Sequence, residues 1–221
     1  ELSPDRQGWR LVVGPAQEPE GVWADAVVLA LPARPAARLL TGVDPGVAEL
    51  VGALDYASIA LVSLALPDAR LPELSGFLVP AEEGMLVKAA TFFTRKWPHL
   101  RRSDGVALVR ASVGRYGEKR SLQRSDDELI EAVWRDLSAL LGSQAVPAPL
   151  AAQVQRWDAA LPQYGPGHLD RVAAARARLR SAHPTLALAG AGYDGVGIPL
   201  CVRSGERAAE EIVTVLTGLR P

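Results

Sequence analysis

Thiol and imidazole groups are scarce in this sequence. It has one cysteine, Cys201, and three histidines, His99, His168 and His183. A single cysteine excludes an internal disulfide and any zinc site built on several thiolates. The histidines lie far apart along the chain and show no spacing typical of metal ligands. We therefore expect no metal site.

Excess positive charge and long apolar runs are also missing. The chain has 24 Lys and Arg against 25 Asp and Glu, so its formal net charge is −1. Binding to phosphate backbones needs concentrated positive charge, which argues against nucleic acid as a partner. No apolar run reaches the roughly 20 residues of a transmembrane helix, and no secretory signal is visible. These absences predict a cytoplasmic protein, with membrane association at its surface left open.

The residues that are present predict a folded protein. Hydrophobic residues make up 48% of the 221 residues and charged residues 22%, a composition typical of globular chains with a substantial core. The first residue is glutamate rather than methionine. We expect a processed product or a piece of a longer chain.

Two short apolar runs near the ends of the chain indicate strands inside a layered sheet. Residues 24–31 and 186–189 are almost continuously apolar and are bounded by helix-breaking or polar residues. Such runs are typical of strands that are buried on both faces. Strands are also expected over 8–13, 22–23 and 154–157. Helices are expected over 35–40, 44–54, 168–181 and 201–216.

The middle of the chain shows a different pattern. Four strand candidates, 59–66, 77–79, 85–93 and 106–112, are separated by turn-rich pieces, which favours an antiparallel sheet. A helix is expected over 125–141. It begins with a capping box of Ser125 and Glu128 and carries an apolar stripe that should cover the sheet; the stripe includes Leu129, Val133, Trp134 and Leu137.

These patterns predict an α/β protein, α+β overall, in which a β-rich domain is inserted into a layered one. The expected division is 1–42, 43–152 and 153–221. The first and last pieces should form one domain. The inserted domain should have a mixed or antiparallel sheet covered by helices.

The segment 186–201 combines a strand, a turn with four glycines and the start of a helix. Glycines allow close approach of a ligand to the backbone, and a helix N-terminus favours an anionic group. The spacing Gly190-x-Gly192-x-x-Gly195 matches the dinucleotide fingerprint formally. Too little chain follows it for the complete strand–helix–strand unit. A bound cofactor and a merely tight strand-to-helix turn both remain open.

The segment 156–168 holds two large aromatic residues, Trp157 and Tyr164, between helix-breaking residues. On spacing alone, Trp157 fits a core anchor and His168 fits a cap of the following helix. Together with the glycine turn, however, this segment gives two motifs, W-x4-PQY-x2-GH over 157–168 and AG-x2-YDGVGIP over 189–199.

The two motifs resemble the C-terminal part of the protoporphyrinogen and coproporphyrinogen oxidases. These are FAD enzymes of haem synthesis within the amine-oxidase-like flavoprotein superfamily. The resemblance extends more loosely over the whole chain, including Trp9 and Lys96-Trp97-Pro98. The pyrophosphate-binding Gly-x-Gly-x-x-Gly unit of that family is not in this sequence, so the chain resembles the C-terminal half of such an enzyme.

The resemblance implies a cofactor, FAD, and residues that contact it. Residues 1–42 and 153–221 would belong to a Rossmann-like FAD-binding domain, and 43–152 to the substrate domain. Backbone groups of Val196, Gly197 and Ile198 would contact the flavin, and Trp157 would pack near its ring. No catalytic side chain is implied, because the cofactor carries the redox chemistry.

The resemblance also implies a substrate, a porphyrinogen that molecular oxygen ultimately oxidises to a porphyrin. Val87 and Ala89 are expected on one wall of its pocket and Lys88 at its carboxylates. Further candidate cations are Arg95, Lys96 and Arg110. For each cation, an ordinary solvated charge is the alternative.

Several alternatives stay open for the function. Coproporphyrinogen III is the preferred substrate, and protoporphyrinogen IX is the alternative. A catalytically incomplete binding module is a further alternative, and a homodimer is left open. A related flavin amine oxidase is disfavoured, because such enzymes usually carry an acidic residue early in the turn.

Overall fold

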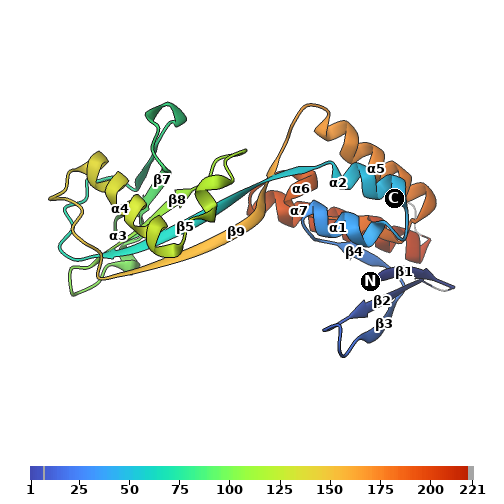
Figure 1. Cartoon of the computed structure of the whole chain (residues 1–221). Helices are drawn as coiled ribbons and strands as arrows, with labels where there is room; N and C mark the ends of the chain where they lie inside the picture. Colours follow the sequence, from blue (N-terminus) through green and yellow to red (C-terminus); the bar gives the residue numbers. More distant parts are fainter. Residues whose placement is uncertain (7, 219–221) are drawn as a thin grey trace. The chain divides into compact units, whose positions relative to one another are not determined.

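The computed structural model describes residues 1–6 and 8–218. It has a mixed α/β fold that divides into two compact units (Figure 1), Glu1–Asp55 with Pro162–Pro221, and Tyr56–Leu161. The expected α/β class is confirmed. The boundaries differ from 42/43 and 152/153, because α2 (Pro45–Gly52) packs with α1 (Ala33–Leu40) and α5 (His168–Ala182) in the first unit. The flavin and substrate roles of the units stay predictions.

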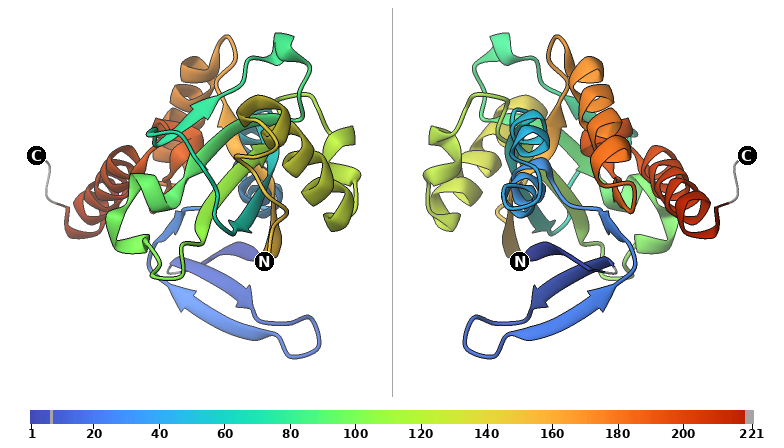
Figure 2. Two further views of the ribbon diagram at one scale, coloured as in Figure 1. Left: turned by 90° about the vertical axis from the view of Figure 1, so that its left-hand side faces the viewer. Right: turned by 90° about the vertical axis from the view of Figure 1, so that its right-hand side faces the viewer.

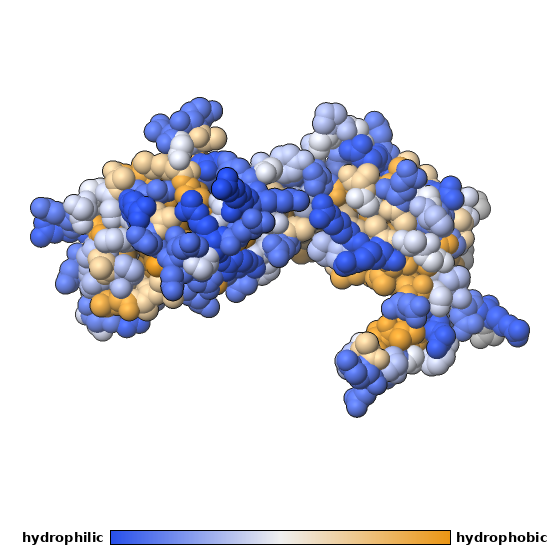
Figure 3. Space-filling view, viewed as in Figure 1, coloured by the Kyte–Doolittle hydropathy of each residue, from blue (hydrophilic) through white to orange (hydrophobic). Residues whose placement is uncertain are grey.

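The first unit contains two small sheets. In one, β1 (Leu2–Asp5), β2 (Gly8–Val13) and β3 (Glu20–Ala24) are antiparallel. In Figure 3, apolar residues gather on the visible face of this sheet, and Val13 and Val22 are among its exposed residues.

The second sheet pairs β4 (Val27–Leu29) with β10 (Leu186–Leu188) in parallel. All three residues of β10 are buried, as expected from its apolar run. The run 24–31 is shorter as a strand, and Val28 is 40% exposed. Burial on both faces was therefore the wrong expectation for β4, because Leu29 lies on a buried face whereas Val28, on the opposite face, is exposed.

Helices of the first unit lie against β10. α5 and α7 (Ile198–Thr217), the orange and the red helix of Figure 2, both contact the strand, and the short α6 (Ala191–Asp194) packs on α7. α7 begins three residues earlier than expected, because Pro199 is compatible with a first helical turn. The sequence pattern missed α6, since four residues are too few to show a helical period.

The second unit is built on one sheet of five strands, in the order β6-β7-β8-β5-β9. The strands are β5 (Asp55–Leu66), β6 (Gly76–Leu78), β7 (Val87–Phe92), β8 (Ala107–Val113) and β9 (Ala151–Gln163), with the short helix α3 (Phe93–Lys96) between β7 and β8. The neighbours β6-β7, β7-β8 and β8-β5 are antiparallel, as expected. β9 is much longer than the predicted 154–157, because its exposed residues give only weak apolar alternation.

Helix α4 (Asp126–Leu141) supplies the core of this unit from one side. Its N-terminus carries the predicted capping box, with Ser125 and Glu128 bonded to each other's backbone N–H. Leu129, Val133 and Leu137 are fully buried in one cluster with residues of β5, β7 and β8. The prediction that α4 packs on the middle strands is therefore confirmed.

Candidate functional site

The glycine turn between β10 and α7 has a backbone that glycine alone adopts easily. Gly190, Gly195 and Gly197 have φ angles of 119°, 115° and 109°, values that side-chain-bearing residues rarely adopt. At Gly195 a Cβ would also lie 2.7 Å from Cδ1 of Leu200. Three of the four glycines therefore meet a real conformational requirement, whereas Gly192 lies within α6.

The end of this turn is open to a ligand. Val196 is 52% exposed and Ile198 81%, and Gly197 between them is also exposed. Gly197 is the N-cap of α7, and no side chain of the described residues caps that helix. The free N–H groups and the helix dipole make this end positive. Apolar side chains beside free N–H groups suit a flat ring with polar edges, so these residues fit a flavin.

A hollow of about 670 Å³ adjoins the turn within the first unit. It is lined by the loop before α5 and by the residues that lead into the turn, and includes Tyr164, His168, Tyr193, Asp194 and Gly195. Residues from both sequence motifs line it. The structure thus brings the PQY-x2-GH and YDGVGIP segments together around one hollow.

The Tyr164 hydroxyl links the two motifs directly. It donates a hydrogen bond to the carbonyl oxygen of Ala191 at 2.6 Å, and its ring lies 4.6 Å from that of His168. His168 is buried at the first position of α5, and Gly167 is the N-cap. The expectation that His168 caps the helix was therefore wrong. Burial, together with the nearby Arg171, lowers the pKa of His168, which favours the neutral ring.

Asp194 anchors the glycine turn from within, between Gly190 and Gly195. Its carboxylate accepts two hydrogen bonds from Arg176, at 2.9 and 2.7 Å, and further bonds from Arg207 and Ser204. Burial alone would raise the pKa of Asp194. The bonds from Arg176, Arg207 and Ser204 outweigh it and hold the pKa far below its ordinary value. Sequence reasoning missed these three partners, because no local spacing links Arg176 to the turn.

Trp157 lies on β9 in the second unit and is 51% exposed. A core anchor would be buried, so that alternative is wrong. Packing beside a flavin ring stays a prediction for this side chain. An exposed indole offers a large flat apolar surface for such a contact.

The family profile described as flavin containing amine oxidoreductase matches residues 6–213 of this chain. The chain belongs to that family. Its relatives include the coproporphyrinogen III oxidase of Mycobacterium bovis, 42% identical over 95% of this chain and 44% of that protein. The Bacillus subtilis enzyme of the same name is 32% identical, over 87% of this chain and 41% of that protein. The chain thus spans less than half the length of these relatives.

Two solved structures share the fold of this chain. A protein from Exiguobacterium sp. 255-15, assigned as a protoporphyrinogen oxidase, superposes with a TM-score of 0.80 at 30% identity. That match covers 96% of this chain and 45% of the other. Cyclohexylamine oxidase from Brevibacterium oxydans IH-35A gives a TM-score of 0.72 at 20% identity, over 98% and 48% of the two chains, which is a likeness of fold alone.

In this member of the family, the predicted substrate residues lie on β7 but do not share one face. A β-bulge between Val87 and Ala89 interrupts the alternation of side chains. Val87 then points into the core with no exposed surface, as Ala90 and Phe92 do, whereas Ala89 and Lys88 are partly exposed. Burial lowers the pKa of Lys88. The substrate role stays a prediction, and Ala89 and Lys88 are its accessible members.

The other candidate cations already have partners in the second unit. Arg95 pairs with Glu73 at 2.6 Å and donates to the carbonyl of Leu71. Lys96 lies over the ring of Trp97, and Arg110 over that of Phe93. These contacts favour structural roles for the three cations over substrate binding.

The described residues hold neither a cluster of metal ligands nor a membrane-spanning helix. Over residues 1–6 and 8–218, the structure places no three His, Cys, Asp or Glu side chains where they could hold a metal ion together. No helix in the same residues has the length and apolar content needed to cross a membrane.

Proposed function

We propose that the complete protein is an FAD-dependent oxidoreductase that converts a porphyrinogen to a porphyrin in haem synthesis, with molecular oxygen as acceptor. The observation that carries the flavin part of this proposal is the open glycine turn, where Val196, Gly197 and Ile198 are exposed at the uncapped start of α7. Membership of the flavin amine oxidoreductase family supports a flavin cofactor.

The residues of this chain would bind and orient the cofactor. Bound FAD would supply the hydride acceptor for the oxidation. The positive N-terminus of α7 would favour negative charge on the part of the cofactor beside it. Val196 and Ile198 would cover its apolar surface and exclude water. Trp157 would add a flat contact, and no side chain of this chain is assigned a proton transfer.

Coproporphyrinogen III is the preferred substrate. This preference is supported by relatives from Mycobacterium and Bacillus that carry the name coproporphyrinogen III oxidase, at 42% and 32% identity. The chloroplastic protoporphyrinogen oxidase of Oryza sativa is 29% identical over 96% of this chain and 41% of that protein, so protoporphyrinogen IX is the second candidate.

The test uses the full-length product of the gene. We expect a yellow protein with flavin absorbance that turns over both porphyrinogens in air, with the higher kcat/KM for coproporphyrinogen III. Porphyrin fluorescence and oxygen uptake would be recorded together. A colourless protein, or a flavoprotein inactive on both porphyrinogens, would contradict the proposal. The isolated 221 residues are expected to bind FAD weakly, because they lack a pyrophosphate-binding unit.

A further inference from the structure

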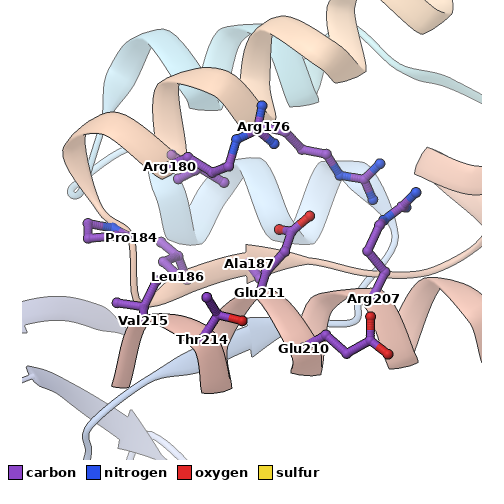
Figure 4. A pocket seen from close by; sticks show the side chains of 11 residues that line it. Arg176, Arg180, Pro184, Leu186, Ala187, Arg207, Glu210, Glu211, Thr214 and Val215 are labelled. Atoms are coloured by element: carbon purple, nitrogen blue, oxygen red, sulfur yellow. The ribbon is translucent and has the colours of Figure 1, made fainter. Parts of the chain in front are cut away.

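A cluster of three charged side chains and one hydroxyl lies beside the glycine turn and joins the helices around it. Asp194 sits at the end of α6, Arg176 comes from α5, and Ser204 and Arg207 come from α7. The side chains of Asp194 and Arg176 are each 13% exposed. In Figure 4, the guanidinium groups of Arg176 and Arg207 point toward one another from the two helices.

The cluster also holds the backbone at the start of the turn. The N–H of Gly190 donates to Oγ of Ser204 at 2.8 Å, and that hydroxyl donates to Asp194. Arg176 donates a further bond to the carbonyl oxygen of Leu188 at 3.3 Å. One carboxylate therefore connects the last residue of β10, the first glycine of the turn and the first half of α7.

Such a connection matters because the turn itself is conformationally free. Its three glycines with positive φ can adopt many backbone conformations, and ordering them costs entropy. Asp194 directly precedes Gly195, and Ser204 and Arg207 lie on the helix that the turn leads into. The carboxylate can therefore fix both the path of the turn and the direction of the start of α7.

We infer that Asp194, held by Arg176, is a positioning residue for the flavin: it aims the exposed start of α7 at the cofactor. This inference rests on the proposed function. Its consequence is that losing the carboxylate weakens flavin binding more than its effect on the stability of the fold would explain.

The chain offers a matched control pair in the same unit. Asp44 is buried, caps α2 through the N–H groups of Gly46 and Val47, and binds Nε of Arg178 at 2.8 Å. It is likewise a buried carboxylate bound to an arginine of α5, but it bonds no residue of the glycine turn. Asp44→Asn and Asp194→Asn therefore make the same chemical change at two places.

The experiment compares these variants in the full-length protein. Each is stripped of flavin and titrated with FAD, and unfolding of the stripped protein is measured separately. We expect Asp194→Asn to weaken FAD binding at least about tenfold, the scale of one lost charged hydrogen bond. We also expect the absorption bands of the bound flavin to shift. Asp44→Asn should lower stability but leave both the dissociation constant and the bands unchanged.

Two further variants cover the case in which Asp194→Asn does not fold. Ser204→Ala removes the link to Gly190 and keeps the ion pair, and Arg176→Lys keeps the charge but loses the paired hydrogen bonds. Both should weaken FAD binding while the protein stays folded. The inference would be overturned if the folded Asp194→Asn variant bound FAD with wild-type affinity and spectrum. It would also be overturned if both Ser204→Ala and Arg176→Lys did so. Equal weakening by Asp44→Asn would also overturn it.

The outcome separates this inference from the proposed function. A wild-type protein that binds no flavin overturns the proposed function, and the inference with it. A wild-type protein that binds flavin and oxidises porphyrinogens, beside an unaffected Asp194→Asn, overturns the inference alone.

Discussion

The hydroxyl of Tyr164 and the carbonyl oxygen of Ala191, 27 residues apart, are joined by a 2.6 Å hydrogen bond. The bond ties the loop after β9 to the first residue of α6. It makes the two sequence motifs parts of one local structure, although a whole helix and a strand separate them along the chain.

Tyr164→Phe removes this bond and keeps the ring against His168. We expect the free energy of unfolding to fall by about 1 kcal/mol, the usual net value of one hydrogen bond. Urea unfolding followed by circular dichroism would measure it. An unchanged midpoint and slope would show that water replaces the lost partner at no cost.

Gly197→Val should remove FAD from the full-length protein and leave the second unit folded. Valine disfavours a φ of 109°, and its side chain would stand where the backbone is expected to approach the flavin. The measurement is flavin content per chain after purification. Gly205→Ala is the control, since an added Cβ there would meet no other side chain of the described residues within 4 Å and alanine favours the helix. Equal flavin content in both variants would show that the turn is merely structural.

His168 should make the stability depend on pH. Its pKa is lowered in the folded state, so the unfolded chain binds the proton more readily. The stabilisation is therefore fully present above the unfolded pKa of about 6.5 and is lost progressively as the pH falls below it. His168→Leu should remove this part of the pH dependence between pH 7 and pH 5. A variant that keeps the wild-type profile would assign the dependence to other groups.

Lys88→Gln tests the predicted substrate contact. If the ammonium group binds a substrate carboxylate, KM for coproporphyrinogen should rise by about tenfold or more, as for the loss of one charged hydrogen bond. The flavin content should not change. Lys119→Gln, at an exposed position, is the matched control. A wild-type KM in the Lys88 variant would show that this lysine is a partly buried charge with no contact to the substrate.

Several features could be predicted from the sequence because their signals are local. The capping box of Ser125 and Glu128, the stripe of α4 and the breakers around β10 depend on residues a few positions apart. The same holds for the four-glycine turn. In each case the residues that carry the pattern also make the contacts.

Other features could not be predicted from the sequence, because the residues that form them are distant along the chain or follow an irregular pattern. Arg176 meets Asp194 across 18 positions, with no regular spacing between them. The bulge after Val87 breaks the two-residue period on which the assignment of faces depended. α6 and most of β9 carry too little apolar periodicity to be found.

The pairing of β5 with β9 has a further consequence. The chain enters the second unit at the start of β5 and leaves it near the end of β9, and these two strands are neighbours in one sheet. The N–H of Leu150 donates to the carbonyl oxygen of Ala65, and the N–H of Ala159 donates to Oγ of Ser58, so the two strands run antiparallel and entry and exit lie side by side. The whole unit therefore behaves as one large loop of the first, closed at its base at small entropic cost. Such a unit can be lengthened, reshaped or exchanged during evolution while the host keeps its own core.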